Sequence, residues 1–437
     1  MSAERRLYLF IGVSIALRIA LVLILHQIHP SALYVNDSPE YIHLAENIVA
    51  GHGFSLDTTA PYTPNSFRTP GYPIFLLISK AVTGTFIIGL LLQCILAGGI
   101  ALLIFKIAQS EGWEKQGLWA ATVFLCMPFS LLVPLQFLTQ TVFTFCVALS
   151  LFAYLQYLKT KRLWYIVICA LLLAIASLTR PIGQYLPSIF ILVSILALYR
   201  QSLTLKQAAA AMVILLGIYG AVLTPWLLHN QKTFGVFALS SITPAFLYLY
   251  DTPAIYATAH HISFEEARTD LIYDMEYETG VSIGDSRYVN FSPLSKLMQQ
   301  RAVEIMLESP TAFVLTRIEL GFNFFFRDGV RYWFEALGAP YSYLHWYTFL
   351  ALAILERLVL LTFILGMAWT IIKGLWEWRT VSLTTVLLTL ACLYFMTLTG
   401  SMASAGLRYP AEPFFLLLGT VGLFQIYRYF STKLQNT

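Results

Sequence analysis

Long apolar runs separated by short polar connections make up most of this chain. Ten of them approach the roughly 20 apolar residues that a membrane-spanning helix needs. These runs lie near residues 7–26, 84–106, 117–135, 140–158, 163–179, 182–199, 207–228, 348–372, 380–399 and 408–428. Two shorter apolar stretches, 72–83 and 310–326, fit short spans, interfacial segments or re-entrant pieces. The pattern predicts an all-α, polytopic membrane protein with about 10–13 transmembrane or re-entrant helices.

Composition points to the same class of protein. Of the 437 residues, 58% are hydrophobic and 11% are charged, whereas a soluble domain is about 45–50% apolar and about 25% charged. The run 7–26 follows Arg5 and Arg6 and is long enough to span, so we expect a retained first helix rather than a cleaved signal peptide. All five cysteines lie inside apolar runs, where we expect small buried side chains rather than disulfides or metal ligands.

Basic residues lie on alternate connections between the ten runs. They are Arg5 and Arg6; Lys106 and Lys115; Lys159, Lys161 and Arg162; Arg200 and Lys206; Lys373 and Arg379; and Arg428 and Lys433. Because cytoplasmic connections carry the excess of lysine and arginine, we expect this side, with both chain termini, to be cytoplasmic. The opposite side then holds the first loop, 27–83, and the stretch that begins at 229. A full span at 310–326 would break this order, which disfavours that assignment.

The sequence predicts three parts: a transmembrane core over 1–228 that includes the first loop 27–83, a polar stretch over 229–309, and C-terminal membrane helices over 310–437. The polar stretch contains ten acidic and five basic residues. Its segments "SFEEARTDLIYDMEYE" and "SPLSKLMQQRAVEIMLES" predict helices with Ser263 and Ser292 as N-caps. We therefore expect a small helical domain on the extracytoplasmic side.

The first loop contains a polar helical segment, "NDSPEYIHLAENIVAGHGFS". Apolar residues recur on it at helical spacing, which gives one face able to lie on the membrane, and glycines follow its last turn. The apolar positions are Tyr41, Leu44, Ala45, Ile48 and Val49, and the glycines are Gly51 and Gly53. Two helix starts fit equally well: Asp37 with Glu40 forms a capping box, whereas Ser38 as the cap puts Pro39 at the first helical position. Only the second start leaves the Asp37 carboxylate free for chemistry.

Five blocks along the chain resemble the GT-C superfamily of integral-membrane glycosyltransferases. They are "NDSPEYIHLAENIVAGHGFS", "SFRTPGYPIFLL", "SLTRPIGQYLP", "TPWLLHNQKTFGVFALS" and "GLRYPAEPFFLLLG". The resemblance is to the bacterial clan related to protein O-mannosyltransferases and lipid A aminoarabinose transferases. It implies a multi-pass inner-membrane enzyme whose active site faces the periplasm or the cell exterior. Such enzymes move a sugar, with inversion, from a polyprenyl-monophosphate donor to a hydroxyl of a glycolipid, a cell-envelope polymer or a protein.

The same resemblance implies roles for single residues. Asp37 matches the first-loop aspartate that is the proposed catalytic base, and Arg68 matches the basic residue that contacts the donor phosphate. These residue types suit the reaction, because the acceptor hydroxyl must lose a proton and the leaving phosphate gathers negative charge. With Asp37 as the base, the helix cap passes to Ser38. Arg180 and Arg408 lie in family blocks near the outer ends of their spans, and each either contacts the donor phosphate or anchors the loops around it.

Four further positions are candidates for substrate contacts. Tyr41, Tyr62 and Tyr72 lie around the first loop and either face the sugar or belong to an interfacial aromatic belt. The family often carries an acid in the stretch that reads "VPLQFLTQTVFTF" here, and the matching position is Gln140. Its amide forms hydrogen bonds but neither binds a proton nor neutralises a cation. Either the acceptor differs, or Asp37 acts alone, or the enzyme is weakened.

No cofactor is expected, and nucleic acid is excluded as a partner. His260 and His261 are best explained by a solvated helix start, and without an H-E-x-x-H pattern or a cysteine cluster a divalent metal is not indicated. Arg18, in mid-span, is equally well explained by a paired structural charge. The alternatives are a lipid-carrier ligase of glycan precursors and a transporter or flippase. A ligase would need a second basic cluster for pyrophosphate and a transporter would show repeats and midplane charges, so the polar groups gathered at one face favour the enzyme.

Overall fold

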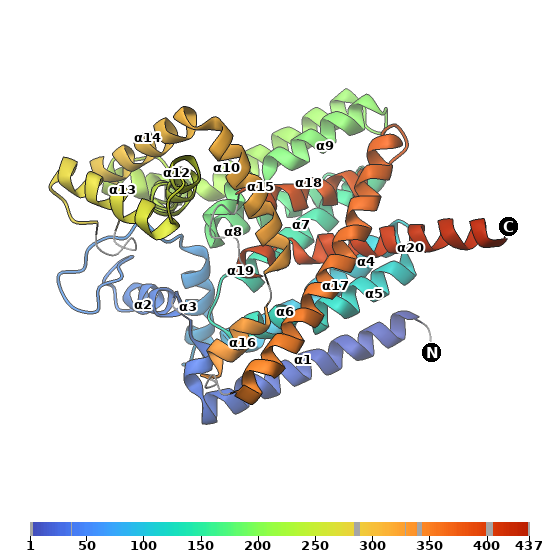
Figure 1. Cartoon of the computed structure of the whole chain (residues 1–437), viewed down its shortest axis with the longest axis horizontal. Coiled ribbons are helices and arrows are strands. Elements are labelled where there is room, and N and C mark those ends of the chain that lie inside the picture. Colours follow the sequence, from blue (N-terminus) through green and yellow to red (C-terminus); the bar gives the residue numbers. More distant parts are fainter. Residues whose placement is uncertain are drawn as a thin grey trace.

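The computed structural model of the chain describes residues 3–35, 37–283, 289–327, 329–338, 343–398 and 405–435 (Figure 1). Nearly all of these residues lie in helices or in the connections between helices. The described ranges contain no named strand, and their one antiparallel bridge joins Ser55 to Pro64. The predicted all-α class is therefore confirmed.

Seven helices of the described ranges are long and apolar enough to cross a membrane. They are α1 (Ala3–Ile28), α4 (Ile87–Ser110), α7 (Gln140–Thr160), α9 (Pro187–Tyr199, preceded by the 3-10 turn η3, Pro181–Tyr185), α10 (Leu205–Phe234), α17 (Tyr343–Trp376) and α20 (Glu412–Gln435). Shorter apolar helices accompany them, namely α3 (Gly71–Thr83), α8 (Trp164–Thr179) and α18 (Leu383–Leu398). This set confirms the prediction of a polytopic membrane protein.

The run at 117–135 does not form a straight span. It folds into α5 (Glu114–Cys126), then α6 (Pro128–Leu132) and the 3-10 turn η2 (Val133–Leu135). The helix axis bends by 67° between α5 and the segment that follows it. Pro128 explains the break, because it lacks an N–H and disfavours a helical conformation at Met127, whose ψ is 134°. The stretch at 310–326 forms α15 (Pro310–Phe326), which is not among the candidate spans.

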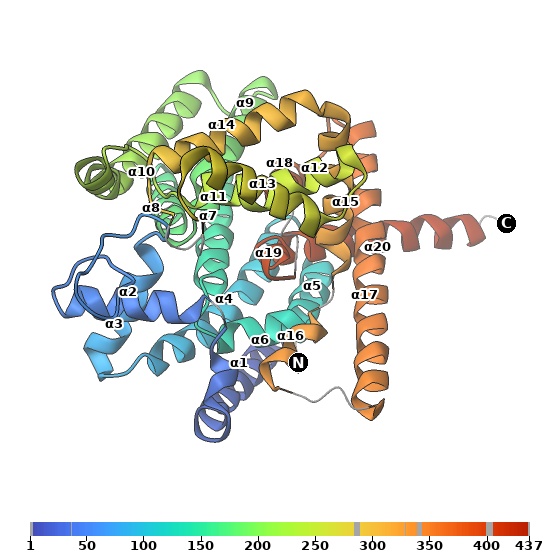
Figure 2. The ribbon, with the colours of Figure 1, turned by 60° about the vertical axis from the view of Figure 1, so that its left-hand side comes forward.

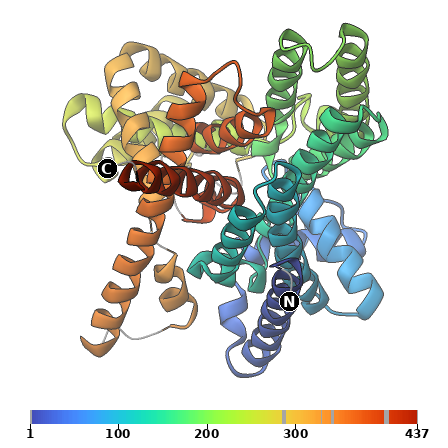
Figure 3. The same ribbon diagram turned by 90° about the vertical axis from the view of Figure 1, so that its right-hand side faces the viewer.

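The N-terminal and C-terminal membrane helices share one apolar core. Helix α20 packs against both α17 and α5, and Phe124, Phe143 and Phe395 from three different helices are fully buried in the same cluster. Figure 3 shows α20 (dark red) beside α17 (orange), with α4 and α5 next to them. Helices α9 and α10 (green) lie at the upper right, opposite α17. The predicted parts 1–228 and 310–437 therefore form a single bundle.

Four helices between the two parts form a separate unit with its own apolar core, here called the polar unit. They are α11 (Ile242–Phe246, continued by the π-helical turn η4, Leu247–Asp251), α12 (Thr252–His260), α13 (Phe264–Thr279) and α14 (Pro293–Glu308). Ser263 and Ser292 cap α13 and α14 as predicted, since each hydroxyl accepts from the N–H three residues ahead. The predicted boundary at 229 falls inside α10, which continues to Phe234. Figures 1 and 2 show the polar unit above α2 in both views and away from the C-terminus.

The first loop folds into η1 (Pro30–Leu33) and α2 (Ser38–Val49) before it reaches α3. Gly51, with a φ of +77°, ends α2: its N–H donates to the Ile48 carbonyl at 3.2 Å, and the N–H of His52 donates to the Asn47 carbonyl at 2.9 Å. This pair of bonds is the Schellman pattern, in which glycine is favoured because it adopts a left-handed conformation without strain.

The apolar face of α2 packs against protein, contrary to its predicted place on the membrane. Tyr41, Leu44 and Ala45 are buried among α3, the following loop and Trp226 of α10. Of the five apolar positions, Val49 alone is largely exposed, at 60%. The helix is therefore fixed to the bundle, which gives its N-terminus a defined position.

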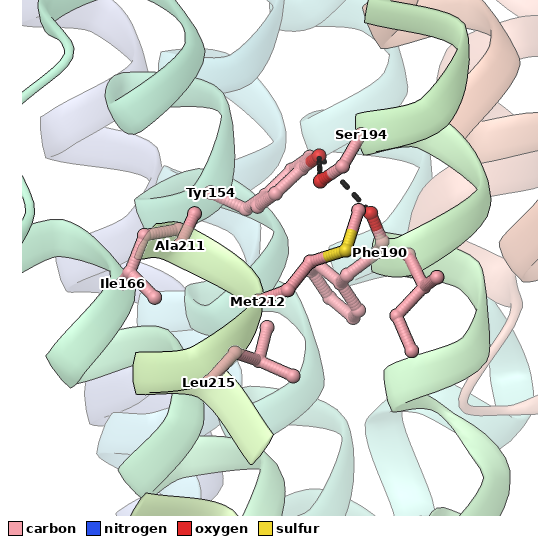
Figure 4. A pocket seen from close by; sticks show the side chains of 8 residues that line it. Tyr154, Ile166, Phe190, Ser194, Ala211, Met212 and Leu215 are labelled. Atoms are coloured by element: carbon pink, nitrogen blue, oxygen red, sulfur yellow. Dashed lines mark hydrogen bonds between the residues drawn. The ribbon is translucent and has the colours of Figure 1, made fainter. Parts of the chain in front are cut away.

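Figure 4 shows a small void within the bundle, between α7, α8, α9 and α10. Its polar groups are already paired: the Tyr154 hydroxyl bonds to Oγ of Ser194 at 2.6 Å and to the Phe190 carbonyl at 3.1 Å. A volume of about 10 Å³ has room for about one water molecule. This void is a packing gap and not a substrate site.

Candidate active site

Asp37 and Arg68 meet at the start of α2. Nη2 of Arg68 lies 3.0 Å from Oδ1 of Asp37. The Asp37 side chain is 48% exposed, whereas that of Arg68 is 10% exposed. One partner of the ion pair is therefore accessible to a substrate, and the other is built into the protein. The structure brings together the two residues that the sequence predicts as base and donor-phosphate contact.

Residues of α2 hold the Arg68 guanidinium on several sides. Besides the Asp37 contact, Nε donates to Oε2 of Glu40 at 2.6 Å, and Nη1 donates to the Tyr41 hydroxyl at 3.2 Å. The rings of Tyr41 and Phe67 each lie 5.1 Å from the guanidinium carbon, within cation–π range. Burial lowers the pKa of Arg68, but Tyr41, Asp37 and Glu40 outweigh burial and raise it above its ordinary value. The group is a permanent cation.

A guanidinium has five N–H donors in a fixed plane. Hydrogen bonds within the described residues use two of the five in Arg68, one on Nε and one on Nη1, while Nη2 is ion-paired with Asp37. One N–H on Nη1 and both on Nη2 donate to no acceptor among these residues. Two such nitrogens of a guanidinium can form paired bonds to the oxygens of a phosphate.

The helix start leaves the Asp37 carboxylate free of the backbone. Asp37 occupies the N-cap position but makes no side-chain capping bond. Glu40, the partner in the predicted capping box, bonds to Arg68 instead. Ser38 does not cap either, which corrects the second prediction: its hydroxyl accepts from the Val35 N–H and donates to the Phe137 carbonyl, both at 3.0 Å. These bonds tie the helix start to the chain before α7.

Arg180 approaches the same place from the end of α8. It lies close enough to Tyr41, Asp37 and Arg68 for their charges to act on it. Its Nη1 donates to Oγ1 of Thr139 at 2.9 Å. Within the described ranges, no carboxylate oxygen lies within 4.0 Å of the Arg180 guanidinium, so that it forms no salt bridge. Arg180 therefore brings an unneutralised cation to the neighbourhood of the Asp37–Arg68 pair.

Gln140 begins α7 directly beside this arginine. The Thr139 hydroxyl, which accepts from Arg180, donates to Oε1 of Gln140 at 3.4 Å. The predicted substitution of an acid by Gln140 therefore has a structural consequence. A carboxylate at this position would lie one hydroxyl away from Arg180 and would neutralise part of its charge.

Close packing fixes the segments that carry the two arginines. A Cβ on Gly71, the first residue of α3, would lie 2.6 Å from the Leu178 carbonyl carbon and 2.7 Å from the Thr179 nitrogen. The main chains of α3 and α8 touch here because glycine has no side chain. Arg68 precedes this contact by three residues, and Arg180 follows it by one.

The predicted tyrosines have different surroundings. Tyr41 contacts Arg68, and burial raises the pKa of Tyr41, so that its phenol stays protonated. Tyr72 is fully buried behind it, with 5.1 Å between the ring centroids, and donates to Oε1 of Gln93 at 2.7 Å. Tyr62 stacks on His52 in the loop, with 3.9 Å between the ring centroids. Tyr41 is thus the one that shares the Arg68 site, and Tyr72 supports it from behind.

Arg408 and Arg18 lie in a buried network apart from this site. Arg408, at the end of α19 (Ala405–Arg408), is fully buried, with Nε donating to Glu412 at 3.0 Å and Nη2 lying 3.7 Å from Glu356. Ser130 links the network to Arg18, since its hydroxyl donates to Glu412 at 2.7 Å and its carbonyl accepts from Arg18 at 3.3 Å. Two arginines thus balance two glutamates. We do not include Arg408 in the proposed donor site, because it is fully buried and no hydrogen bond or ion pair of the described residues joins it to Asp37 or Arg68.

A polar cleft lies between α2 and the loop that follows it. It has a volume of about 430 Å³ and is bounded by His43 and the loop at 56–63. Hydrogen bonds hold this part of the chain, since Asp57 accepts from the N–H of Thr63 at 2.7 Å and Asn47 donates to the carbonyls of Ser55 and Asp57. Across the described residues, no three histidine, cysteine or acidic side chains are arranged to hold a metal ion.

Sequence reasoning missed the role of Glu40 at this site. It considered Glu40 as a capping residue, whereas the structure uses it as the closest partner of Arg68. The available signal was its spacing, because Asp37 and Glu40 lie three residues apart and therefore on one side of a helix. Thr139 carried no such signal, since only the fold brings it to Arg180.

No family model and no curated protein sequence matches the chain. Among solved structures, it is similar to the archaeal oligosaccharyltransferase AglB from Archaeoglobus fulgidus, in complex with an inhibitory peptide and a dolichol-phosphate, with 12% identity and a TM-score of 0.49. The match covers 92% of this chain and 48% of AglB, so the chain spans about half the length of that protein. It is also similar to ArnT from Cupriavidus metallidurans, with 13% identity, 97% of this chain and 78% of ArnT covered, and a TM-score of 0.42. A second ArnT structure, bound to undecaprenyl phosphate, gives a TM-score of 0.41 at 13% identity, with 93% of this chain and 77% of ArnT covered. Both proteins are GT-C superfamily membrane glycosyltransferases.

Proposed function

We propose that this protein is an inverting glycosyltransferase that moves a sugar from a polyprenyl-monophosphate donor to a hydroxyl of an extracytoplasmic acceptor. One observation carries the proposal: a half-exposed carboxylate, Asp37, lies 3.0 Å from a buried arginine, Arg68, that keeps N–H groups on Nη1 and Nη2 without an acceptor among the described residues. A base and a phosphate-binding cation in direct contact are the two groups that such a transfer requires.

Asp37 acts as the general base. The acceptor oxygen attacks the anomeric carbon while its proton moves to the carboxylate, and the bond between that carbon and the phosphate oxygen breaks. The exposed fraction of Asp37 supports this assignment over Glu40, which is only 5% exposed and is bonded to Arg68. An acceptor hydroxyl can approach the first carboxylate and not the second.

Arg68 and Arg180 stabilise the leaving phosphate. The free edge of Arg68 bonds to two phosphate oxygens, and Arg180 adds a second positive charge from the end of α8. Tyr41 contributes as well, because its hydroxyl accepts from Arg68 and its own proton has no acceptor within the described residues. These groups remain fixed during the reaction, so little free energy is lost in reorganising them.

The charge of the site favours a monophosphate donor over a pyrophosphate. Two arginines face two carboxylates, Asp37 and Glu40, so the site is neutral before the donor binds. A polyprenyl-phosphate sugar brings one negative charge, and a pyrophosphate-linked donor brings two. No additional basic cluster contacts this group in the described ranges, which disfavours the ligase alternative.

The test is the fate of the lipid donor in cells. Mass spectrometry of extracted polyprenyl-phosphate lipids should reveal a sugar-loaded monophosphate lipid that accumulates in a deletion strain and disappears when the wild-type chain is restored. Identical lipid pools would contradict the proposal. A reconstituted protein that moves the loaded lipid across a vesicle membrane without forming a glycosidic bond would establish the transporter or flippase instead.

A further inference from the structure

The segment just before Arg68 is bonded to the polar unit, although it belongs to the first loop. Asn290 precedes α14 and contacts this segment twice: its Oδ1 accepts from the Ser66 N–H at 2.7 Å, and its Nδ2 donates to the Pro64 carbonyl at 3.0 Å. The carboxamide thus pairs with the main chain two residues apart, as a neighbouring strand would. Among the standard side chains, this pairing needs the adjacent donor and acceptor of an amide.

Two serines between α10 and α11 contact the same segment. Oγ of Ser240 donates to the Phe67 carbonyl at 2.5 Å, and the N–H of Ser241 donates to the Ser66 carbonyl at 2.9 Å. The Ser66 hydroxyl closes the arrangement, since it lies 3.1 Å from both Oγ of Ser241 and Oδ1 of Asn290. The main chain of residues 64–67 is therefore held by a network of hydrogen bonds from outside the first loop.

Phe67 anchors the segment in a second way. Its side chain is 1% exposed and belongs to the apolar core of the polar unit, 6.4 Å from the ring of Phe246. The residue directly before Arg68 thus lies in the core of a different folding unit. By contrast, Tyr41 and Ala45 of α2 belong to a core cluster of the membrane bundle.

Arg68 therefore has two sets of contacts. Its guanidinium is held by Asp37, Glu40 and Tyr41 of α2, which is fixed to the bundle. Its preceding main chain is held by the polar unit through Asn290 and the core around Phe67. A shift of either unit relative to the other would move the guanidinium away from the Asp37 carboxylate or from the phosphate.

We propose that Asn290 is a positioning residue that makes the hold of Arg68 on the donor phosphate depend on the polar unit. The proposal rests on the proposed function, in which Arg68 contacts that phosphate. Asn290 touches no reacting atom in this scheme. It acts by holding residues 64 and 66, which fixes the start of the Arg68 side chain, and the polar unit is thereby a working part of the donor site.

The experiment measures the affinity of the purified full-length protein for undecaprenyl phosphate. We expect Asn290→Ala to weaken binding about fivefold to tenfold, a coupling of the size found between residues that share partners. Asn290→Asp should weaken binding by the same factor. The carboxylate oxygen that replaces Nδ2 would face the Pro64 carbonyl and could not donate to it. Asn47→Ala is the matched control: Asn47 also clamps loop carbonyls, those of Ser55 and Asp57, but none in the segment before Arg68. Its affinity should stay within twofold of the wild type.

A double substitution separates positioning from folding. In an Arg68→Ala background, which should itself weaken binding about tenfold or more because a charge-assisted bond is lost, Asn290→Ala should have no further effect. Wild-type affinity for Asn290→Ala, or an equal loss in both backgrounds, would overturn the proposal while leaving the donor site intact. If Arg68→Ala alone binds undecaprenyl phosphate as the wild type does, the phosphate contact of the proposed function is wrong and the positioning role is wrong with it.

Discussion

Replacing Asp37 by asparagine should stop sugar transfer without disturbing the site. The substituted amide keeps an oxygen at the place where Oδ1 now lies 3.0 Å from Nη2 of Arg68. General-base assistance is worth about 10²–10⁴-fold, so we expect turnover to fall about 10³-fold, or ~4 kcal/mol of barrier. Donor binding should not weaken, because the substitution removes a negative charge from beside the phosphate.

The assay compares the polyprenyl-phosphate lipids of a deletion strain that carries either the wild-type chain or Asp37→Asn. Blocked transfer leaves the loaded donor unused, so a sugar-bearing monophosphate lipid should accumulate in the variant strain alone. The mass of that lipid identifies the class of sugar. The purified variant should also keep its unfolding midpoint and its affinity for undecaprenyl phosphate, which shows that the protein is folded and the donor site intact.

Glu40→Gln is the matched control, because it removes the other carboxylate that contacts Arg68. The glutamine oxygen can still accept from Nε of Arg68, as Oε2 of Glu40 does at 2.6 Å. Its buried position also keeps it from an acceptor hydroxyl. We expect a loss of about tenfold or less, from the weaker bond to the guanidinium alone. Unchanged lipid pools in the Asp37→Asn strain would refute the base assignment. Equal accumulation for both variants would show that the two carboxylates act only through the charge of Arg68.

Four further substitutions test the surrounding geometry. Arg68→Lys should lower turnover about 10–100-fold at an unchanged unfolding midpoint, since an ammonium cannot keep three partners and also grip two phosphate oxygens; measured lipid accumulation checks it. Arg180→Gln should weaken binding of undecaprenyl phosphate about tenfold. The fold should keep its stability, because the substitution leaves no carboxylate of the described residues unpaired. Wild-type affinity of this variant would remove Arg180 from the donor site. Gly71→Ala should destabilise the protein by about 1–3 kcal/mol, since its Cβ would lie 2.6 Å from main-chain atoms of α8; thermal unfolding measures this. Arg408→Leu should lower the free energy of unfolding by about 3–5 kcal/mol, because two buried glutamates lose their cation; a soluble, equally stable variant would contradict the structural role.

The sequence alone was enough for the class of fold, and it singled out Asp37 and Arg68, which the structure brings together. Apolar run lengths located the spans because a bilayer fixes the length of a crossing helix. They could not show that the run at 117–135 bends by 67°, since hydropathy does not register how Pro128 breaks a helix inside an apolar run. The block around Asp37 pointed to a carboxylate that serves chemistry rather than capping, and the absence of a capping bond at this residue agrees with it.

The remaining parts of the site depend on long-range packing. Asn290 is 224 residues from Ser66, and Thr139 is 41 residues from Arg180, so no local pattern links either pair. The sequence leaves Arg408 either a donor contact or a loop anchor, and only the fold shows that Glu356 and Glu412 pair with its charge and that its Nη1 donates to carbonyls at the end of α15. Charge pairing inside a helical bundle is decided by which helices meet, and a single sequence does not carry that information.

The resting contacts of Arg68 indicate which partner gives way when a donor arrives. A buried cation needs compensation for its lost hydration, and α2 supplies it from several groups. Glu40 is buried and hydrogen-bonded at 2.6 Å, whereas Asp37 is half exposed and ion-paired at 3.0 Å. An exposed pair in contact with water is the weaker of the two, so in the proposed scheme a phosphate on Nη1 and Nη2 loosens the contact with Asp37 before the bond to Glu40. The loosened carboxylate can then turn toward solvent, where the acceptor hydroxyl would enter, so that donor binding itself would make the base available.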